Sequence, residues 1–371
     1  MITRHISRRL LLTTALATAL PLTAHADEPI KVVATFSILG DMVSVVGGDA
    51  IELTTLVGPD GDAHVYSPTP QDAKAVSEAD VLMINGLEFE GWLERLTEAA
   101  SFDGKLVVAT DGIEAIAFGE DDHDEHEDHD EHGHDEHGHD DHAEEKHDDH
   151  DHDEHAHDDE HKHEEHADDE HGHDEEKHDD HAGHDDHDDH AGHDHGAFDP
   201  HAWQSVENAM VYVDNIANGL AQADPDNASD YFTNRAAYMA ELESLQAEVT
   251  EAMAALPDDK RTVVTSHDAF GYFAGAYGLS FEAPVGLSTE AEASAGEVAE
   301  LITQIKDEGI SAVFVETITD NRLMEQIAGE TGAVIGGTLY SDALSGEDGP
   351  ASTYLDMMRY NAATISGALG S

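Results

Sequence analysis

One long tract of this sequence lacks the apolar residues that a folded core requires, so any folded domain must be formed by the residues outside it. The 76 residues from Glu120 to His195 contain 25 His, 38 Asp or Glu and 3 Lys, but no Leu, Ile, Val, Phe, Tyr, Trp or Met. Because nothing apolar is available to offset the loss of chain entropy, we expect a disordered, acidic, His-rich insert. Imidazoles beside carboxylates are ligand types that Zn²⁺ accepts, so the tract predicts weak binding of several metal ions rather than a purely solvated linker.

The first 26 residues also stand apart from the folded part. Three arginines precede the apolar run Leu10–Leu22, and the small-residue pattern Ala24-His25-Ala26 follows it. This order is typical of a cleavable secretory signal, and the run is shorter than the ~20 residues that span a bilayer. We expect a signal peptide over residues 1–26 and a mature protein in the periplasm.

Composition excludes several classes of protein. The sequence has no cysteine, which rules out disulfides, thiolate metal sites and a lipid-modified cysteine. We therefore expect a freely diffusing, monomeric protein. The formal net charge is −67, of which the His-rich insert supplies −35. Such a polyanion repels phosphates, so nucleic acid is not an expected partner, whereas cations are.

The remaining 269 residues, 27–119 and 196–371, suffice for two lobes. Short β-branched runs alternate there with longer amphipathic stretches, which indicates an α/β fold with two lobes, each with a mainly parallel sheet flanked by helices. In such folds a ligand binds in the crevice outside the C-terminal ends of the strands. The expected strands are Ile30–Phe36, Ile51–Val57, Val81–Ile84, Leu106–Ala109, Arg261–Thr265, Ala312–Glu316 and Ala333–Thr338.

A long helix is expected between the lobes. From Tyr231 to Leu256 apolar residues recur at spacings of three and four, and Pro257 follows. At 1.5 Å per residue the helix would be ~39 Å long and would join the lobes as a rigid strut. The expected organisation is an N-terminal lobe of residues 27–119 plus 196–230, a linking helix of residues 231–257 and a C-terminal lobe of residues 258–371.

Three histidines are the sharpest functional clue. Of 30 His, 25 lie in the insert and two in the signal peptide, which leaves only His64, His201 and His267 in the folded part. Each follows an expected strand or lies at a turn. A single histidine is more often a surface or hydrogen-bonded residue than a metal ligand, but three at strand-to-helix junctions favour a shared site.

A fourth ligand should be an oxygen donor. Asp342 follows the last expected strand at its C-terminal end, and Glu316, which ends the preceding strand, is the rival. Three imidazoles and one carboxylate suit tetrahedral Zn²⁺, whereas a Mn²⁺ site would be expected to hold more carboxylates.

These residues resemble the solute-binding proteins of metal-specific ABC importers, the cluster A-I group, and within it the zinc receptors called ZnuA. The resemblance extends over residues 28–369 and rests on His64 to Asp72, on Asn85-Gly86-Leu87 with Gly91-Trp92-Leu93, and on Asp199-Pro200-His201. It implies that His64, His201, His267 and Asp342 bind Zn²⁺ and that the partner is an inner-membrane ABC permease. Manganese receptors of this group typically have Glu where His267 stands, and several zinc receptors have a disulfide that this chain lacks.

Three other functions stay open at this point. Three histidines around Zn²⁺ also describe hydrolytic enzymes, but no His-Glu-x-x-His helix and no nucleophile beside a base is present, so no enzyme is expected. A periplasmic zinc buffer would use the insert as its functional part, and a Mn²⁺ or Fe²⁺ receptor would share the fold. Dependence of growth on the protein under zinc starvation separates a receptor from a buffer.

Overall fold

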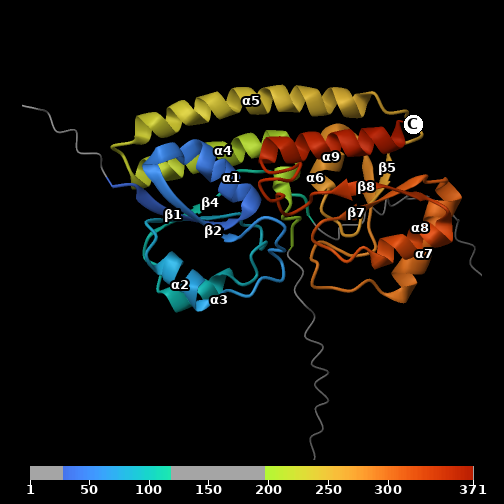
Figure 1. Ribbon diagram of the computed structural model, residues 1–371, viewed down its shortest axis with the longest axis horizontal. Coiled ribbons are helices and arrows are strands. Elements are labelled where there is room, and N and C mark those ends of the chain that lie inside the picture. The colour runs from blue at the N-terminus through green and yellow to red at the C-terminus, as the bar shows by residue number, and fades with distance from the viewer. Residues whose placement is uncertain (1–27, 118–196, 371) are drawn as a thin grey trace, which may run out of the picture. The chain divides into compact units, whose positions relative to one another are not determined.

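Two four-stranded parallel sheets organise the protein. The structure is a computed structural model that describes residues 28–117 and 197–370, so the expected signal peptide and His-rich insert lie outside the described residues. The strand orders are β2-β1-β3-β4 in the first lobe and β6-β5-β7-β8 in the second, and every pair is parallel. Helices flank both sheets (Figure 1). The expected fold of two α/β lobes is confirmed.

The first lobe is built from segments on both sides of the insert. Its central strand, β3, is buried along its whole length, as expected for a parallel sheet covered by helices on both faces. The strands are β1 Ile30–Phe36, β2 Ile51–Val57, β3 Val81–Ile84 and β4 Lys105–Val108. The helices are α1 Ser37–Gly47, α2 Pro70–Ser77, α3 Leu93–Ala100 and α4 Val206–Ala223, with the 3₁₀ turns η1 Gly48–Ala50 and η2 Ala202–Gln204.

The second lobe repeats the arrangement with one strand that the sequence did not predict. Strand β6 has only three residues, too few to show an alternating pattern. It follows the left-handed Gly278 at the end of α6 and pairs with β5. The strands are β5 Thr262–Val264, β6 Ser280–Glu282, β7 Ala312–Glu316 and β8 Val334–Leu339. The helices are α6 Gly271–Tyr277, α7 Ala295–Glu308, α8 Arg322–Thr331 and α9 Tyr354–Leu369.

The long helix α5, Ala228–Ala254, lies along both lobes (Figure 1). It packs on α1 and α4 of the first lobe and on α6 and α9 of the second. Its buried face carries Tyr231, Tyr238, Leu242, Leu245, Val249 and Met253. The last four are apolar positions of the predicted spacing, whereas Phe232, which belongs to the same pattern, is exposed. The helix begins three residues before the predicted start and ends two residues before the predicted end. The two lobes therefore share one continuous helical support.

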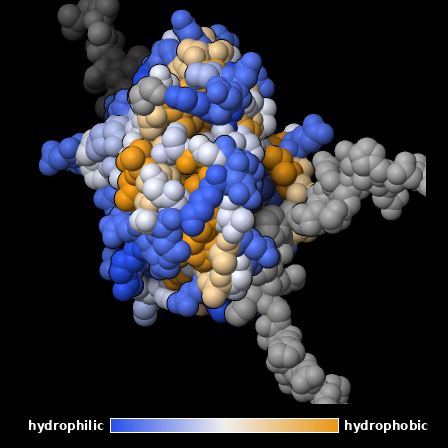
Figure 2. Space-filling view, turned by 90° about the vertical axis from the view of Figure 1, so that its right-hand side faces the viewer, coloured by the Kyte–Doolittle hydropathy of each residue, from blue (hydrophilic) through white to orange (hydrophobic). Residues whose placement is uncertain are grey.

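The face of the second lobe that Figure 2 shows is a mixture of hydrophilic areas and smaller apolar patches. Val334 and Ile335 of β8 are the exposed large hydrophobic residues of this lobe among those described. No helix in residues 28–117 or 197–370 combines the length and the apolar character needed to cross a membrane.

Candidate metal centre

His64 lies on the loop that joins β2 to α2. A capping box closes the start of α2, because the Thr69 hydroxyl accepts from Asp72 N while the Asp72 carboxylate accepts from Thr69 N. Nearer the histidine, Asp62 Oδ1 accepts a hydrogen bond of 2.9 Å from His64 N. These hydrogen bonds fix the loop both at His64 and at the start of α2.

His201 stands immediately before η2, where the chain re-enters the first lobe. Asp199 Oδ1 accepts from His201 N at 2.9 Å and lies 2.8 Å from His201 Nδ1. A carboxylate at Nδ1 favours a proton on that nitrogen, which leaves the Nε2 lone pair free for a metal ion. Asp199 therefore fixes both the backbone and the ring of His201.

His267 follows β5 and is supported in the same way from another strand. Glu316 Oε1, at the end of β7, accepts from Ser266 N at 2.8 Å and from His267 N at 3.0 Å. Glu316 Oε2 lies 2.7 Å from His267 Nδ1. The rival for the fourth ligand thus lies behind the imidazole, on the side away from its Nε2.

Asp342 is carried into the site by the segment after β8, which is fastened to the first lobe. Ser341 O accepts from Trp203 Nε1 and from Gln204 Nε2, each at 2.8 Å. Two residues beyond Asp342, Leu344 N donates to Ser37 Oγ at 3.0 Å. These bonds hold the carboxylate of the second lobe against two histidines of the first.

The three Nε2 atoms converge on the Asp342 carboxylate. Asp342 Oδ2 lies 3.1 Å from His64 Nε2 and 3.2 Å from His267 Nε2, and Asp342 Oδ1 lies 3.6 Å from His201 Nε2. His64 Nε2 and His201 Nε2 are 3.3 Å apart. A tetrahedral ion with bonds of ~2.0 Å requires ligand atoms about 3.3 Å apart, and these four separations are close to that value.

Burial and charge also fit a cation. All four residues are buried, and one ligand atom from each lies within 4.8 Å of the others. His267 Nε2 and Asp342 Oδ1 have no hydrogen-bond partner among the described residues. Burial disfavours the charged form of His267, but the carboxylates of Glu316 and Asp342 outweigh it and hold the pKa of His267 well above its ordinary value. Burial likewise acts against ionised Asp342, yet His201 and His267 hold its pKa well below the usual range.

Several supporting residues were missed from the sequence. Asp62, Asp199 and the aromatic Phe89, whose ring centroid is 4.8 Å from that of His64, all contact the predicted ligands. A signal for the two aspartates was present, because each precedes its histidine by two residues. Phe89 had no such signal, since its contact with His64 arises only when β2 and β3 are placed in one sheet.

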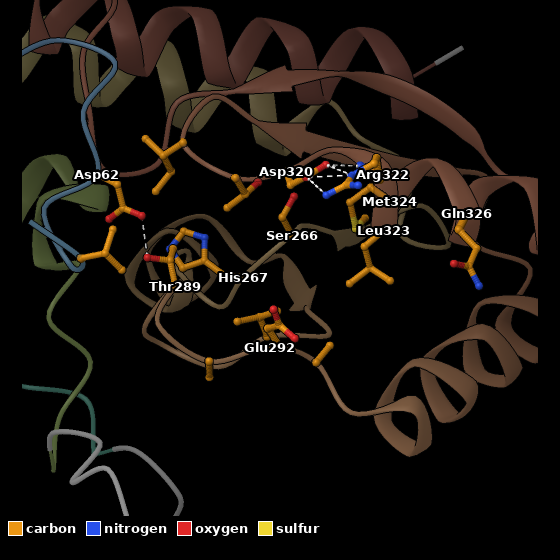
Figure 3. A pocket seen from close by; sticks show the side chains of 16 residues that line it. Asp62, Ser266, His267, Thr289, Glu292, Asp320, Arg322, Leu323, Met324 and Gln326 are labelled. Carbon is orange, nitrogen blue, oxygen red and sulfur yellow. Dashed lines mark hydrogen bonds and ion pairs between the residues drawn. The ribbon is translucent and has the colours of Figure 1, made fainter.

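A pocket of about 580 Å³ opens beside His267 (Figure 3). Asp62 of the first lobe and Thr289 of the second face each other there, with Thr289 Oγ1 donating to Asp62 Oδ2 at 2.6 Å. Asp320 and Arg322, also on the wall, pair with each other. The acidic Glu292 and several apolar side chains also line the pocket.

Comparison with known proteins decides the family. The model of ZnuA, the periplasmic zinc-uptake complex component A, matches residues 32–368. The chain belongs to this family. The iron ABC transporter substrate-binding lipoprotein MtsA of Streptococcus pyogenes is 29% identical over 353 residues, which cover 94% of this chain and 91% of MtsA. The chain is therefore a metal-binding receptor of an ABC importer, as its motifs predicted.

Other relatives differ in the metal for which they are named. The manganese-binding lipoprotein MntA of Halalkalibacterium halodurans is 29% identical over 347 residues, which cover 94% of this chain and 91% of MntA. The Mn-bound periplasmic metal-binding protein of Candidatus Liberibacter asiaticus has a TM-score of 0.65 and 26% identity, covering 92% of this chain and 99% of that protein. Family membership thus establishes metal binding, and the choice of metal depends on the donor set.

Proposed function

We propose that the protein captures Zn²⁺ in the periplasm, after export through its N-terminal signal, and delivers the ion to an ABC permease in the inner membrane. His64, His201, His267 and Asp342 are the proposed ligands. The observation that carries the proposal is the convergence of three Nε2 atoms on one carboxylate at separations of 3.1 to 3.6 Å. Zn²⁺ accepts four such ligands in a closed tetrahedral site.

Two carboxylates behind the imidazoles support zinc in this role. Asp199 and Glu316 each lie within 2.8 Å of a histidine Nδ1, the arrangement that orients imidazole and raises its basicity toward a metal. Glu316 is thereby engaged with His267, which favours Asp342 as the oxygen ligand. A closed set of four protein ligands leaves no position for a reacting water, in keeping with transport rather than catalysis.

Manganese or ferrous iron is the second candidate, because relatives of similar identity are named for these metals. Mn²⁺ prefers oxygen ligands and a higher coordination number than three imidazoles and one aspartate supply. The donor set therefore favours zinc among the metals of the family.

Alanine variants of the four ligands test the site. In a protein lacking residues 120–195, His64→Ala, His201→Ala, His267→Ala and Asp342→Ala should each weaken Zn²⁺ binding by about 3 kcal/mol, or about 100-fold, because each removes one of four bonds. Competition with a chromophoric chelator measures the dissociation constant.

The variant Glu316→Gln separates the two oxygen candidates. It changes a group that orients His267 and should cost only about 10- to 100-fold. A Glu316→Gln loss far larger than that of Asp342→Ala would make Glu316 the ligand, and unchanged affinity in any histidine variant would remove that histidine from the site.

A further inference from the structure

The turn at residues 85–90, which joins β3 to the segment leading to α3, has an unusual backbone. Gly86, Leu87 and Glu88 have φ values of 90°, 53° and 61°, three left-handed residues in a row. Two of them are not glycine, and a left-handed conformation is strained for such residues because their Cβ atom approaches the backbone too closely. A backbone of this kind persists only where surrounding contacts impose it, and at this turn they do.

A buried carboxylate imposes the shape of the turn. Glu90 Oε1 accepts from Asn85 N at 2.7 Å and from Thr35 Oγ1 at 2.6 Å, and Glu90 Oε2 accepts from Gly86 N at 3.3 Å. Glu90 is 5% exposed, and burial raises the pKa of its carboxyl. The carboxyl group thus binds the first two N–H groups of the turn and fastens them to β1 through Thr35.

One consequence of this shape is the placement of Asn85 against the chain at His201. Asn85 is fully buried, and its Nδ2 donates to Pro200 O at 2.9 Å. Its Oδ1 accepts from the hydroxyl of Tyr212 on α4 at 2.5 Å, which fixes the orientation of the amide. The bond to Pro200 O therefore acts on the residue directly before a proposed zinc ligand.

A second consequence is the placement of Phe89 against both histidines of the first lobe. The Phe89 ring is edge-on to His64 at 4.8 Å and to His201 at 6.1 Å between ring centroids. It also packs on Phe36 and Trp203, each at 4.9 Å. Among the described residues no carboxylate is paired with His64 Nδ1, so the Phe89 ring is a main support of that imidazole.

We infer that the 85–90 turn positions two metal ligands at once, with Asn85 and Phe89 as positioning residues for His201 and His64. The inference rests on the proposed function, because it assigns a role toward zinc. The strained backbone is retained because relaxing it would withdraw the amide from Pro200 O and the ring from His64. Neither residue is a proposed ligand.

Two variants of the full chain test this inference. Asn85→Asp keeps the size of the side chain but replaces the donor that faces Pro200 O with an acceptor, and Phe89→Leu removes the aromatic ring while keeping the site apolar. Val76→Ala is the matched control, because Val76 is fully buried in α2 of the same lobe and is not among the proposed ligands or positioning residues. Three quantities are measured: the Zn²⁺ dissociation constant against a tight chelator, the visible spectrum with one equivalent of Co²⁺, and the melting temperature.

The two positioning variants should weaken zinc by about 10-fold or more and alter the Co²⁺ spectrum, as loss of ligand support does. Val76→Ala should lower the melting temperature without changing either metal readout. The inference would be overturned if Phe89→Leu kept the wild-type zinc affinity and Co²⁺ spectrum. It would also be overturned if Asn85→Asp kept both metal readouts and changed only in its melting temperature. Absence of tight zinc in the wild-type protein would instead refute the proposed function, so the two failures are distinguishable. Should Asn85→Asp not fold, Phe89→Leu decides alone.

Discussion

At the scale of single residues, two carboxylates that are not proposed ligands support the candidate centre. Asp199 and Glu316 each bind the backbone N–H and lie at the Nδ1 of one histidine, so a single side chain sets both where the ligand is and which nitrogen is free. His64 is held differently, by Asp62 at its backbone and Phe89 at its ring. The three imidazoles are therefore not equivalent.

Trp203 should report on metal binding. The residue is fully buried, and its ring centroid is 5.3 Å from that of His201. Binding of an ion to His201 changes the charge beside the indole, so we predict a change in tryptophan fluorescence on addition of Zn²⁺. Trp203→Phe should abolish most of this change. Trp92, the other tryptophan, packs on Tyr66, and a full signal in Trp203→Phe would place the response there.

The three histidines could be singled out in the sequence because the folded part contains no others. Asp342 could be proposed only as one of two carboxylates after neighbouring strands. What separates it from Glu316 is side-chain direction, since Glu316 turns toward Nδ1 of His267 and Asp342 toward Nε2. A contact between residues of two sheets depends on how the lobes pack, which a linear pattern does not encode.

At the scale of elements, the strands were predictable because buried parallel strands consist of short β-branched runs. Strands β1, β2, β3 and β7 have the predicted bounds, whereas β6 is too short to give a pattern. The periodic face of α5 likewise specified a long helix. The junction of α1 with α9 was not visible in the sequence, since Asp41 and Tyr354 are far apart in the chain.

That junction makes a pH-dependent contribution to stability. Asp41 on α1 accepts from Tyr354 N at the start of α9, near Asp356 of α9 and Tyr238 of α5. Burial, with a smaller effect of Asp356, raises the pKa of Asp41 to about 6 from 3.8. The folded state then binds the proton more tightly, so this contribution is present below pH ~4 and is lost as the pH rises through 6.

The variant Asp41→Asn isolates this contribution, because the amide keeps an acceptor for Tyr354 N and cannot ionise. Between pH 4 and pH 7 the wild-type protein should lose up to about 3 kcal/mol of unfolding free energy relative to Asp41→Asn. Urea titrations at several pH values give the unfolding free energy of each protein. In the difference between wild type and Asp41→Asn, the contributions of the other titrating groups cancel. A difference independent of pH would show that Asp41 has an ordinary pKa.

At the scale of the whole molecule, the described residues bring together a candidate metal site, and the sequence adds a tract rich in possible metal ligands. Residues 28–117 and 197–370 contain both sheets and all four proposed ligands. In the sequence the His-rich insert follows Gly119 and ends six residues before His201. We therefore predict that its imidazoles, tethered by a short link, can reach the candidate centre. Such a tether would give them an effective concentration of roughly millimolar, from which we predict collection of scarce zinc and its transfer by ligand exchange.

The most direct test is a competitive titration of Zn²⁺ against Mn²⁺, with elemental analysis, on the full chain and on a variant lacking residues 120–195. The account predicts one tight zinc per protein in both forms, with Mn²⁺ bound much more weakly. The full chain should hold several further, weaker zincs that are lost below about pH 6, because imidazole with a pKa near ~6.5 binds metal only when neutral. Loss of the tight site on deletion, or binding of Mn²⁺ as tight as that of Zn²⁺, would contradict the assignment of a zinc centre to His64, His201, His267 and Asp342.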